Sequence, residues 1–188
     1  MALLPLGEDS LRLEHLERKD AKHLFLFINS NRKWLQKFFP ITLNENKNEE
    51  DSLAYIKQKA LLKIEKKEYI FTIKTQKEST ILGLVILKEL NWIKGRAEVA
   101  YCVQQNIRNL GWATLAVNQI VKYAFDSLQL LILESHIHKS NLASIRVAEK
   151  CGFEWTKTLS KSHSTSAGIC LDMELYEAKN EREVLPLH

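Results

Sequence analysis

A nearly continuous apolar run from Ile81 to Leu87 constrains the fold of this chain more than any other feature. A strand with one face in water alternates apolar and polar residues, whereas this run has no polar face to expose. We therefore expect a central strand whose two faces are both covered. Alternating patterns predict neighbouring strands at residues 69–74 and 96–103, which makes the centre of the sheet an antiparallel meander.

Helical patterns precede and follow this meander. Before it, apolar spacing predicts helices from Asp20, over residues 32–38 up to Pro40, and over a long segment that begins at Asn48, after a short strand at residues 11–16. After it, the patterns predict a helix at about 112–128, a strand at 130–136, a helix at 141–150 and strands near 153–158 and 169–176. This order indicates one mixed α/β sheet covered by helices.

The long helix after Asn48 carries two sets of side chains. The first is an apolar stripe, which predicts a face packed on the sheet: Leu53, Ile56, Ala60 and Ile64. The second is a group of clustered lysines: Lys57, Lys59, Lys63, Lys66 and Lys67. Because Glu65 and Glu68 stand among them and no nucleic-acid-binding module is recognisable, we interpret the lysines as a solvated helix face and expect no nucleic-acid partner.

The length of 188 residues and the composition are those of one globular domain, since 45% of the residues are hydrophobic and 27% are charged. We expect a single domain over 1–188, with a core at about 11–176 and a polar tail at 177–188. No apolar run approaches the roughly 20 residues of a membrane span, and the first residues do not resemble a signal peptide. A cytoplasmic location follows, which the three widely spaced cysteines support because they make a disulfide framework improbable.

The segment from Arg108 to Thr114 is the first that carries chemistry. It lies between a predicted strand and a predicted helix, where exposed backbone N–H groups can bind an anion. Gly111 leaves room for a phosphate oxygen, Ala113 keeps the next position small, and Arg108 adds a positive charge. A plain chain turn is the alternative interpretation. The glycine patterns of P-loops and of dinucleotide-binding folds are both absent.

The second such segment is the helix that begins at Asn141 and ends before Gly152 and Phe153. Asn141 and Ser144 are three residues apart and therefore share one face of that helix. Taken alone, Asn141 is equally typical of a helix N-cap, and the Ser144 hydroxyl can satisfy a nearby carbonyl.

Together, the R-x-x-G-x-A turn and the N-x-x-S helix ending in C-G-F resemble the GNAT superfamily of acyl-CoA-dependent N-acyltransferases. Three stretches look like the branch that acetylates the N-termini of ribosomal proteins: residues 11–21, Asn31-Arg-Lys-Trp-Leu-Gln, and Ala97-Glu-Val-Ala-Tyr-Cys-Val. The resemblance extends over about residues 11–176. It implies a twisted, mostly antiparallel sheet whose fourth and fifth strands are parallel and splay apart, with helices on both faces.

The resemblance also implies acetyl-CoA as the acetyl donor, with CoA as the product. The pantetheine arm would pair with the fourth strand, the pyrophosphate would lie on the amides of the glycine turn, and Asn141 would hydrogen-bond the arm. The implied binding residues are Tyr101, Cys102, Val103, Arg108, Asn109, Leu110, Gly111, Trp112, Ala113, Thr114, Asn141 and Ser144. Asn109 stands where the family often has Gly, a departure that the turn tolerates because Asn adopts left-handed backbone angles readily.

The implied reaction is direct attack of a neutral amine on the thioester, so a base must first remove a proton. Glu98 is the candidate base, acting through water, and Ser144 is the candidate donor to the departing thiolate. A solvent-facing carboxylate or an ion-pair partner is the alternative interpretation of Glu98. The ribosomal branch would have an acidic residue in the loop before the last strand, but residues 159–168 contain none. His163 is an alternative base there, or a solvated loop residue.

We expect the acceptor to be a protein or peptide N-terminus. A small amine is the alternative acceptor, and an acyl-CoA-binding module without turnover is the non-enzymatic alternative. We expect a monomer or homodimer, and no metal, because Glu134, His136 and His138 share a strand face without a further ligand at a metal-site spacing.

Overall fold

The predicted central strand is the middle of an eight-stranded sheet in the computed structural model, which describes residues 3–6, 11–75, 79–107, 110–165 and 168–180. Strand β4 (Ile81–Asn91) pairs with β3 (Tyr69–Thr75) and with β5 (Arg96–Val103), and residues 81–87 are buried throughout. The expectation of a central strand with two covered faces is therefore confirmed.

The sheet is antiparallel except at one junction. Its order is β1-β2-β3-β4-β5-β6-β8-β7. The remaining strands are β1 (Leu3–Leu6), β2 (Leu11–His15), β6 (Ile132–Ile137), β7 (Glu154–Ser164) and β8 (Cys170–Lys179). Only β5 and β6 run parallel among these neighbours, and they are the fourth and fifth of the strands expected from the sequence.

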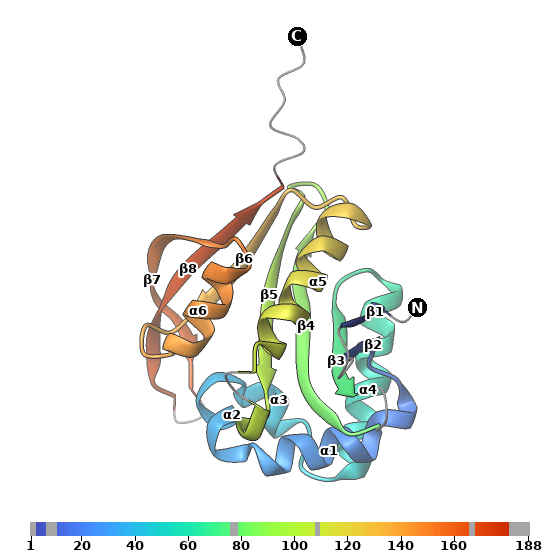
Figure 1. Ribbon diagram of the computed structural model, residues 1–188. Coiled ribbons are helices and arrows are strands. Elements are labelled where there is room, and N and C mark those ends of the chain that lie inside the picture. Colours follow the sequence, from blue (N-terminus) through green and yellow to red (C-terminus); the bar gives the residue numbers. More distant parts are fainter. Residues whose placement is uncertain (1–2, 7–10, 76–78, 108–109, 166–167, 181–188) are drawn as a thin grey trace.

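Helices cover both faces (Figure 1). Two lie on one face, α5 (Trp112–Asp126) and α6 (Leu142–Lys150). Four cover the other, α1 (Ala21–Ser30), α2 (Arg32–Phe38), α3 (Pro40–Asn44) and α4 (Glu49–Ile64). Two short 3-10 helices, η1 (Arg18–Asp20) and η2 (Gln105–Ile107), lead into this framework. None of the helices in the described part of the chain is both long and apolar enough to cross a membrane.

The alternation of side chains along the strands produces two separate cores. Val85, Val99 and Tyr101 pack with α5 and α6, whereas Leu84 and Cys102 pack with α1–α4. Period-2 alternation sends successive side chains to opposite faces, so one strand supplies both cores.

Three details differ from the expectations. Pro40 follows α2 but also begins α3, because Pro is tolerated at the first position of a helix. The last strand continues to Lys179, three residues into the expected tail. On α4, Ile64 is 77% exposed and Ala60 is exposed as well. The buried residues of α4 are Ser52, Tyr55 and Ile56, all of which lie in the first half of the helix.

Candidate active site

The parallel pairing of β5 and β6 stops after three residues. Its last pair is Glu98 with Glu134, although β5 continues to Val103 and β6 to Ile137. Just beyond that pair, the buried Ser135 hydroxyl donates to the Val99 carbonyl at 3.0 Å. From there the strands diverge toward α2 (Figure 1), as expected of the fourth and fifth strands.

A cavity of about 320 Å³ opens where the strands diverge; we call it the splayed-strand cavity. Nine of the predicted binding residues line it: Tyr101, Cys102, Val103, Gly111, Trp112, Ala113, Thr114, Asn141 and Ser144. Leu110 is 58% exposed and is not part of its wall. Arg108 and Asn109 lie outside the described residues.

The start of α5 presents backbone donors to this cavity. Gly111 is the N-cap in a left-handed conformation with φ of 79°, and the first helical hydrogen bond is from the Leu115 amide to the Gly111 carbonyl. The amides of Trp112, Ala113 and Thr114 therefore have no partner within the helix. A Cβ built at Gly111 would meet no atom within 4 Å. This open turn with converging N–H groups is suited to a phosphate group.

The start of α6 supplies the opposite wall. The Asn141 side-chain oxygen accepts from the Ser144 amide at 3.3 Å, so Asn141 does cap the helix as well as line the cavity. The Tyr101 hydroxyl donates to the Ser144 carbonyl at 2.6 Å. Burial raises the pKa of the Tyr101 hydroxyl and raises that of the Cys102 thiol to about 12, which keeps both side chains uncharged at neutral pH.

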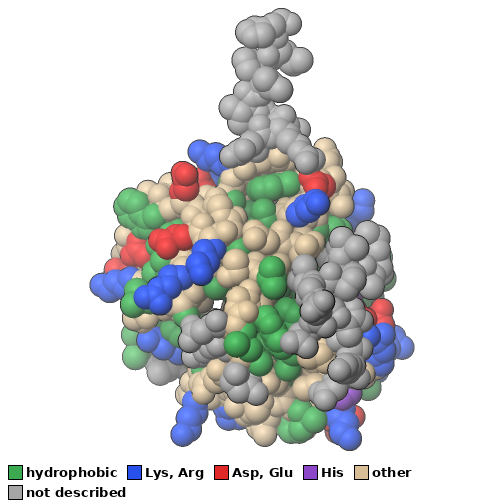
Figure 2. Space-filling model, viewed as in Figure 1, with side chains coloured by type: hydrophobic (Ala, Val, Ile, Leu, Met, Phe, Trp, Pro, Cys, Tyr) green, Lys and Arg blue, Asp and Glu red, His purple; other side chains and the backbone are tan. Residues whose placement is uncertain are grey.

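Six lining residues were missed by the sequence analysis: Trp34, Ile107, Ala143, Arg146, Val147 and Lys150. Arg146 and Lys150 are one helical turn apart on α6, and that spacing on a helix already suspected of a binding role was a usable signal. Trp34 belongs to the stretch Asn31-Arg-Lys-Trp-Leu-Gln that resembles the ribosomal branch, but that resemblance did not assign it to the cavity. Figure 2 shows cationic side chains over α6 and apolar side chains gathered over the start of α5.

Helix α2 is tied to the loop before α6. The Lys37 ammonium donates to the Ser140 hydroxyl at 3.3 Å, and the same hydroxyl lies 2.8 Å from Nδ1 of His138. Partial burial, followed by the charges of Lys37 and Lys139, lowers the pKa of His138. Two cations, Lys37 and Lys139, thus stand near the loop before α6, where the charge of Asp172 acts on His138 in the opposite direction.

Glu98 does not line the splayed-strand cavity. Its carboxylate lies 3.0 Å from the Lys88 ammonium and 3.6 Å from Nδ1 of His136, with the Glu98 side chain 13% exposed. The contacts continue across the sheet, since Nε2 of His136 lies 3.6 Å from Glu134, which in turn pairs with Arg96 at 2.7 Å. Glu98 thus stands in an ionic ladder at the last pair before the strands separate.

The loop before the last strand is part of a long hairpin in which His163 belongs to β7. Its own residues supply no carboxylate, but Asp172 of β8 accepts from the Lys161 amide at 2.8 Å. An acidic side chain therefore reaches the hairpin from the neighbouring strand, which the sequence order did not reveal.

Residues 10–154 match the protein family described as an acetyltransferase (GNAT) domain. The chain is 30% identical over 141 residues to "Probable N-acetyltransferase YjcK" of Bacillus subtilis, which covers 73% of this chain and 77% of that one. It is 25% identical over 143 residues to spermidine N(1)-acetyltransferase of Vibrio cholerae, which covers 76% and 78%.

Solved structures share the fold at lower identity. The ribosomal-protein-S5-alanine acetyltransferase from Vibrio fischeri superposes with a TM-score of 0.83 at 17% identity over 95% of this chain and 97% of that one. The ribosomal L7/L12 α-N-protein acetyltransferase RimL, solved with CoA, gives 0.85 at 15% identity over 95% and 98%.

Proposed function

The chain belongs to the acetyltransferase (GNAT) domain family, and from that premise we propose that it transfers an acetyl group from acetyl-CoA to the N-terminal amine of a protein or peptide. The family establishes an acetyl-CoA-dependent N-acetyltransferase; the acceptor and the residue roles are the proposal. The observation that carries it is the cavity between the splayed strands, with the Gly111 turn on one wall and the start of α6 on the other.

The residues around this cavity fit acetyl-CoA. The open space over Gly111 leaves the first amides of α5 free to bind a pyrophosphate, and Arg146 and Lys150 add positive charge. No anionic side chain is among the lining residues, all of which belong to the described part of the chain. When bound, acetyl-CoA supplies an acetyl group activated as a thioester.

Glu98 serves in this proposal as the base. A protein N-terminal amine has a pKa of about 7.7–8.0, so a proton must leave it before the amine can attack. Glu98 shares a strand face with Cys102, a cavity residue, and precedes the point of divergence. Because its carboxylate lies outside the cavity wall, it takes the proton through water. The Ser144 hydroxyl, on the other wall, donates a hydrogen bond to the leaving sulfur.

The charge around the cavity mouth favours a peptide over a polyamine. Lys37 and Lys139 stand near His138 where α2 meets the loop before α6, and their two charges outweigh that of Asp172 in lowering the pKa of His138. An excess of cations there repels a polycationic acceptor. The similarity to a spermidine acetyltransferase keeps a small amine as the second candidate. We expect peptides beginning with Ser or Ala to be acetylated at least about tenfold more efficiently than spermidine, as measured by CoA release.

The test of the base is Glu98→Gln, with Glu89→Gln as the matched control. Glu89 lies on the neighbouring strand β4 and is exposed. We expect Glu98→Gln to lower kcat about 100-fold with acetyl-CoA affinity changed less than twofold, and Glu89→Gln to change neither. An unaltered rate in Glu98→Gln removes Glu98 from the mechanism. Acetyl-CoA binding without CoA release from any amine or peptide would favour a binding module without turnover.

A further inference from the structure

A second hollow, of about 270 Å³, lies on the opposite side of the sheet from α5. We call it the α4 hollow; it is bounded by the end of β2, by η1 and by α4. Its lining residues are Leu16, Glu17, Arg18, Ile56, Lys59, Ala60, Lys63 and Ile70. None of them lines the splayed-strand cavity, so an inference about this hollow does not depend on the acetyltransferase assignment.

The floor of the α4 hollow is apolar. Ile56 and Ile70 are 1% and 5% exposed, and Ala60 and Leu16 complete the surface. Ile56 and Ala60 belong to the stripe that we expected to be packed on the sheet. Near Ala60 that packing is missing, and the stripe faces the hollow instead. A concave apolar surface of this kind favours the apolar part of a ligand.

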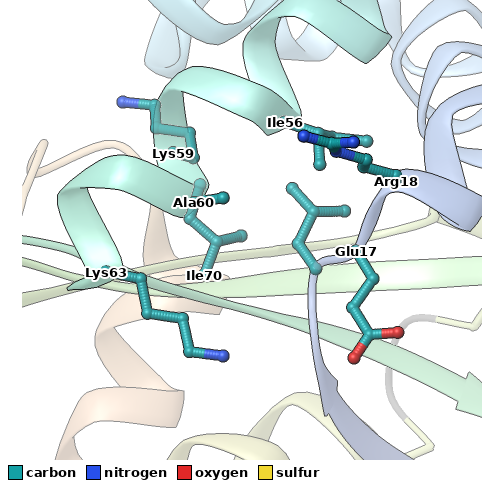
Figure 3. Close-up of a pocket in the computed structure, with 8 residues that line it drawn as sticks. Glu17, Arg18, Ile56, Lys59, Ala60, Lys63 and Ile70 are labelled. Atoms are coloured by element: carbon teal, nitrogen blue, oxygen red, sulfur yellow. The ribbon is translucent and has the colours of Figure 1, made fainter.

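The sides of the α4 hollow are cationic. Figure 3 shows Arg18, Lys59 and Lys63 around it, with Ala60 and Ile70 between them. Lys59 is neutralised by Glu68 at 3.0 Å. Within the described residues, neither Arg18 nor Lys63 lies within ion-pair distance of a carboxylate. Lys59 and Lys63, which we expected on a solvated helix face, thus both line the hollow, but the Lys59 ammonium points away from it (Figure 3).

Two other titratable groups lie near these cations. The one acid in the wall, Glu17, is paired with Lys19 at 2.9 Å, and that hydrogen bond is the main reason for its lowered pKa, to which the charge of Lys63 also contributes. His15 precedes Leu16; burial, and then the charge of Lys63, lower its pKa to about 4, so His15 is neutral at neutral pH. Among the described residues, Arg18 and Lys63 thus have no carboxylate within ion-pair distance, and the single wall acid leaves the hollow with an excess of positive charge.

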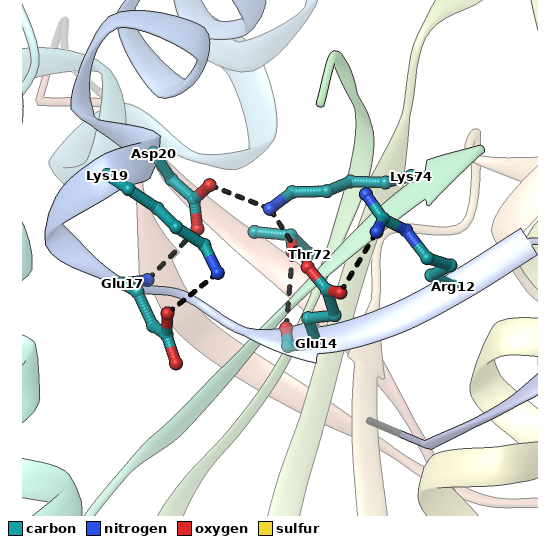
Figure 4. A network of polar contacts seen from close by, with 7 residues as sticks. All are labelled: Arg12, Glu14, Glu17, Lys19, Asp20, Thr72 and Lys74. Atoms are coloured by element: carbon teal, nitrogen blue, oxygen red, sulfur yellow. Dashed lines mark hydrogen bonds and ion pairs between the residues drawn. The ribbon is translucent and has the colours of Figure 1, made fainter. Parts of the chain in front are cut away.

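A buried ionic network holds the hollow in shape. The Lys74 ammonium is 1% exposed and lies 2.7 Å from Asp20 and 3.2 Å from Glu14 (Figure 4). The Asp20 carboxylate also accepts from the Glu17 amide at 3.1 Å. These contacts fix η1 to β2 and β3, so the hollow is already formed before a ligand arrives.

We propose that the α4 hollow binds a small carboxylate with an apolar body, such as an aryl or short alkyl carboxylate. At the ~30 Å³ that a water molecule occupies in the liquid, the hollow holds roughly nine non-hydrogen atoms, the size of benzoate. The apolar body lies on Ile56, Ala60 and Ile70, and the carboxylate lies between Arg18 and Lys63. Arginine and lysine are the side chains that donate the strongest hydrogen bonds to carboxylates.

The test is an NMR titration of the full chain, labelled with ¹⁵N, with benzoate as the probe and benzamide, benzylamine and inorganic phosphate as comparisons. Each titration is run with and without saturating CoA, so that occupancy of the other cavity is separated from occupancy of this one. We expect saturable benzoate shifts at the amides of Ile56, Ala60 and Ile70 in both conditions. Benzamide and phosphate are expected to bind at least about tenfold more weakly, and benzylamine not at all.

Three variants and a control assign the binding to the hollow. Arg18→Gln and Lys63→Gln each weaken benzoate about tenfold, and Ala60→Phe abolishes binding by filling the floor while it leaves every charge in place. Lys57→Gln, on the same helix but outside the wall, is expected to have no effect.

Four outcomes overturn the proposal. If benzamide binds as tightly as benzoate, the cations do not contribute to binding. If phosphate binds as tightly as benzoate, the apolar floor does not contribute. Shifts that map only to the splayed-strand cavity, or no saturable shift at all, remove the site. A failure of CoA to bind would affect the acetyltransferase proposal and leave the benzoate result interpretable.

Discussion

The two edges of β5 are built in opposite ways. Toward β4, β5 is paired from Val103 with Gly83 to Glu98 with Lys88 and again at Arg96 with Asn91, with one irregularity between these last two pairs. Toward β6, only residues 96–98 are paired. The candidate active site therefore lies where the ladder between β5 and β6 is incomplete. One edge holds the strand in place so that backbone groups on the other edge remain available to a ligand.

A side chain added at Gly83, in the strand that pairs with β5, should have the largest effect on stability. A Cβ at Gly83 would lie 2.6 Å from the Cys102 carbonyl oxygen and 2.9 Å from the Ile73 side chain. We expect Gly83→Val to lower the free energy of unfolding by about 3 kcal/mol, as overpacking between two central strands does. Urea denaturation measures it.

Gly152→Ala is the control for this prediction. Gly152 has a positive φ, but a Cβ at that position would meet no atom within 4 Å, so only backbone strain acts. A loss below about 0.5 kcal/mol in Gly83→Val would show that the strands adjust easily and that the paired edge is not rigid.

A substitution at Gly111, in the turn beside the unpaired part of β5, should affect cofactor binding rather than folding. Gly111→Glu places a negative charge where the pyrophosphate is expected, and we predict a loss of acetyl-CoA affinity of about 100-fold, or about 2.7 kcal/mol, in calorimetric titration. Gly111→Ala carries the same left-handed strain without charge and should lose less than tenfold. Unchanged affinity in Gly111→Glu would rule out the turn as the phosphate site.

The smallest effect is expected for the hydrogen bond that joins Ser135 of β6 to Val99 of β5, just beyond the last parallel pair. Ser135→Ala leaves the buried Val99 carbonyl without the hydroxyl that now donates to it. We expect a loss of about 1 kcal/mol in unfolding free energy, since the bond is buried and its acceptor stays behind. Ser162→Ala removes a similar hydroxyl-to-carbonyl bond at an exposed position and should cost about 0.5 kcal/mol or less. Equal losses of unfolding free energy in the two variants would show that the Ser135–Val99 hydrogen bond stabilises the fold no more than an exposed one does.

Local patterns in the sequence were sufficient to predict most elements. The bounds of β5 were predicted without error, and Asn48 and Asn141 cap α4 and α6 because their side chains accept from amides three residues on. These features depend on a few neighbouring residues. The glycine turn and the start of α6, each ambiguous when taken alone, were joined into one expected site by the resemblance to a known family, and both line the cavity.

Features that depend on packing could not be predicted. Trp34 enters the cavity from a helix distant in sequence, and the ladder around Glu98 needs residues from four strands. The apolar stripe of α4 correctly predicted the burial of Ile56 but not the exposure of Ile64, because periodicity does not reveal how far along a helix the burial extends. Three residues of the less buried part of α4 line the hollow: Lys59, Ala60 and Lys63.

The position of β8 has a consequence for how the protein forms during synthesis. β7 leaves the ribosome before β8, yet β8 lies between β7 and β6 in the sheet. β7 ends at Ser164, so its partner strand is complete only after fifteen further residues, up to Lys179, have been made and Cys170–Lys179 has inserted beside β6. At elongation rates of about 5–20 residues per second, β7 remains without its full partner for roughly one to three seconds, which exposes it to aggregation and to chaperones.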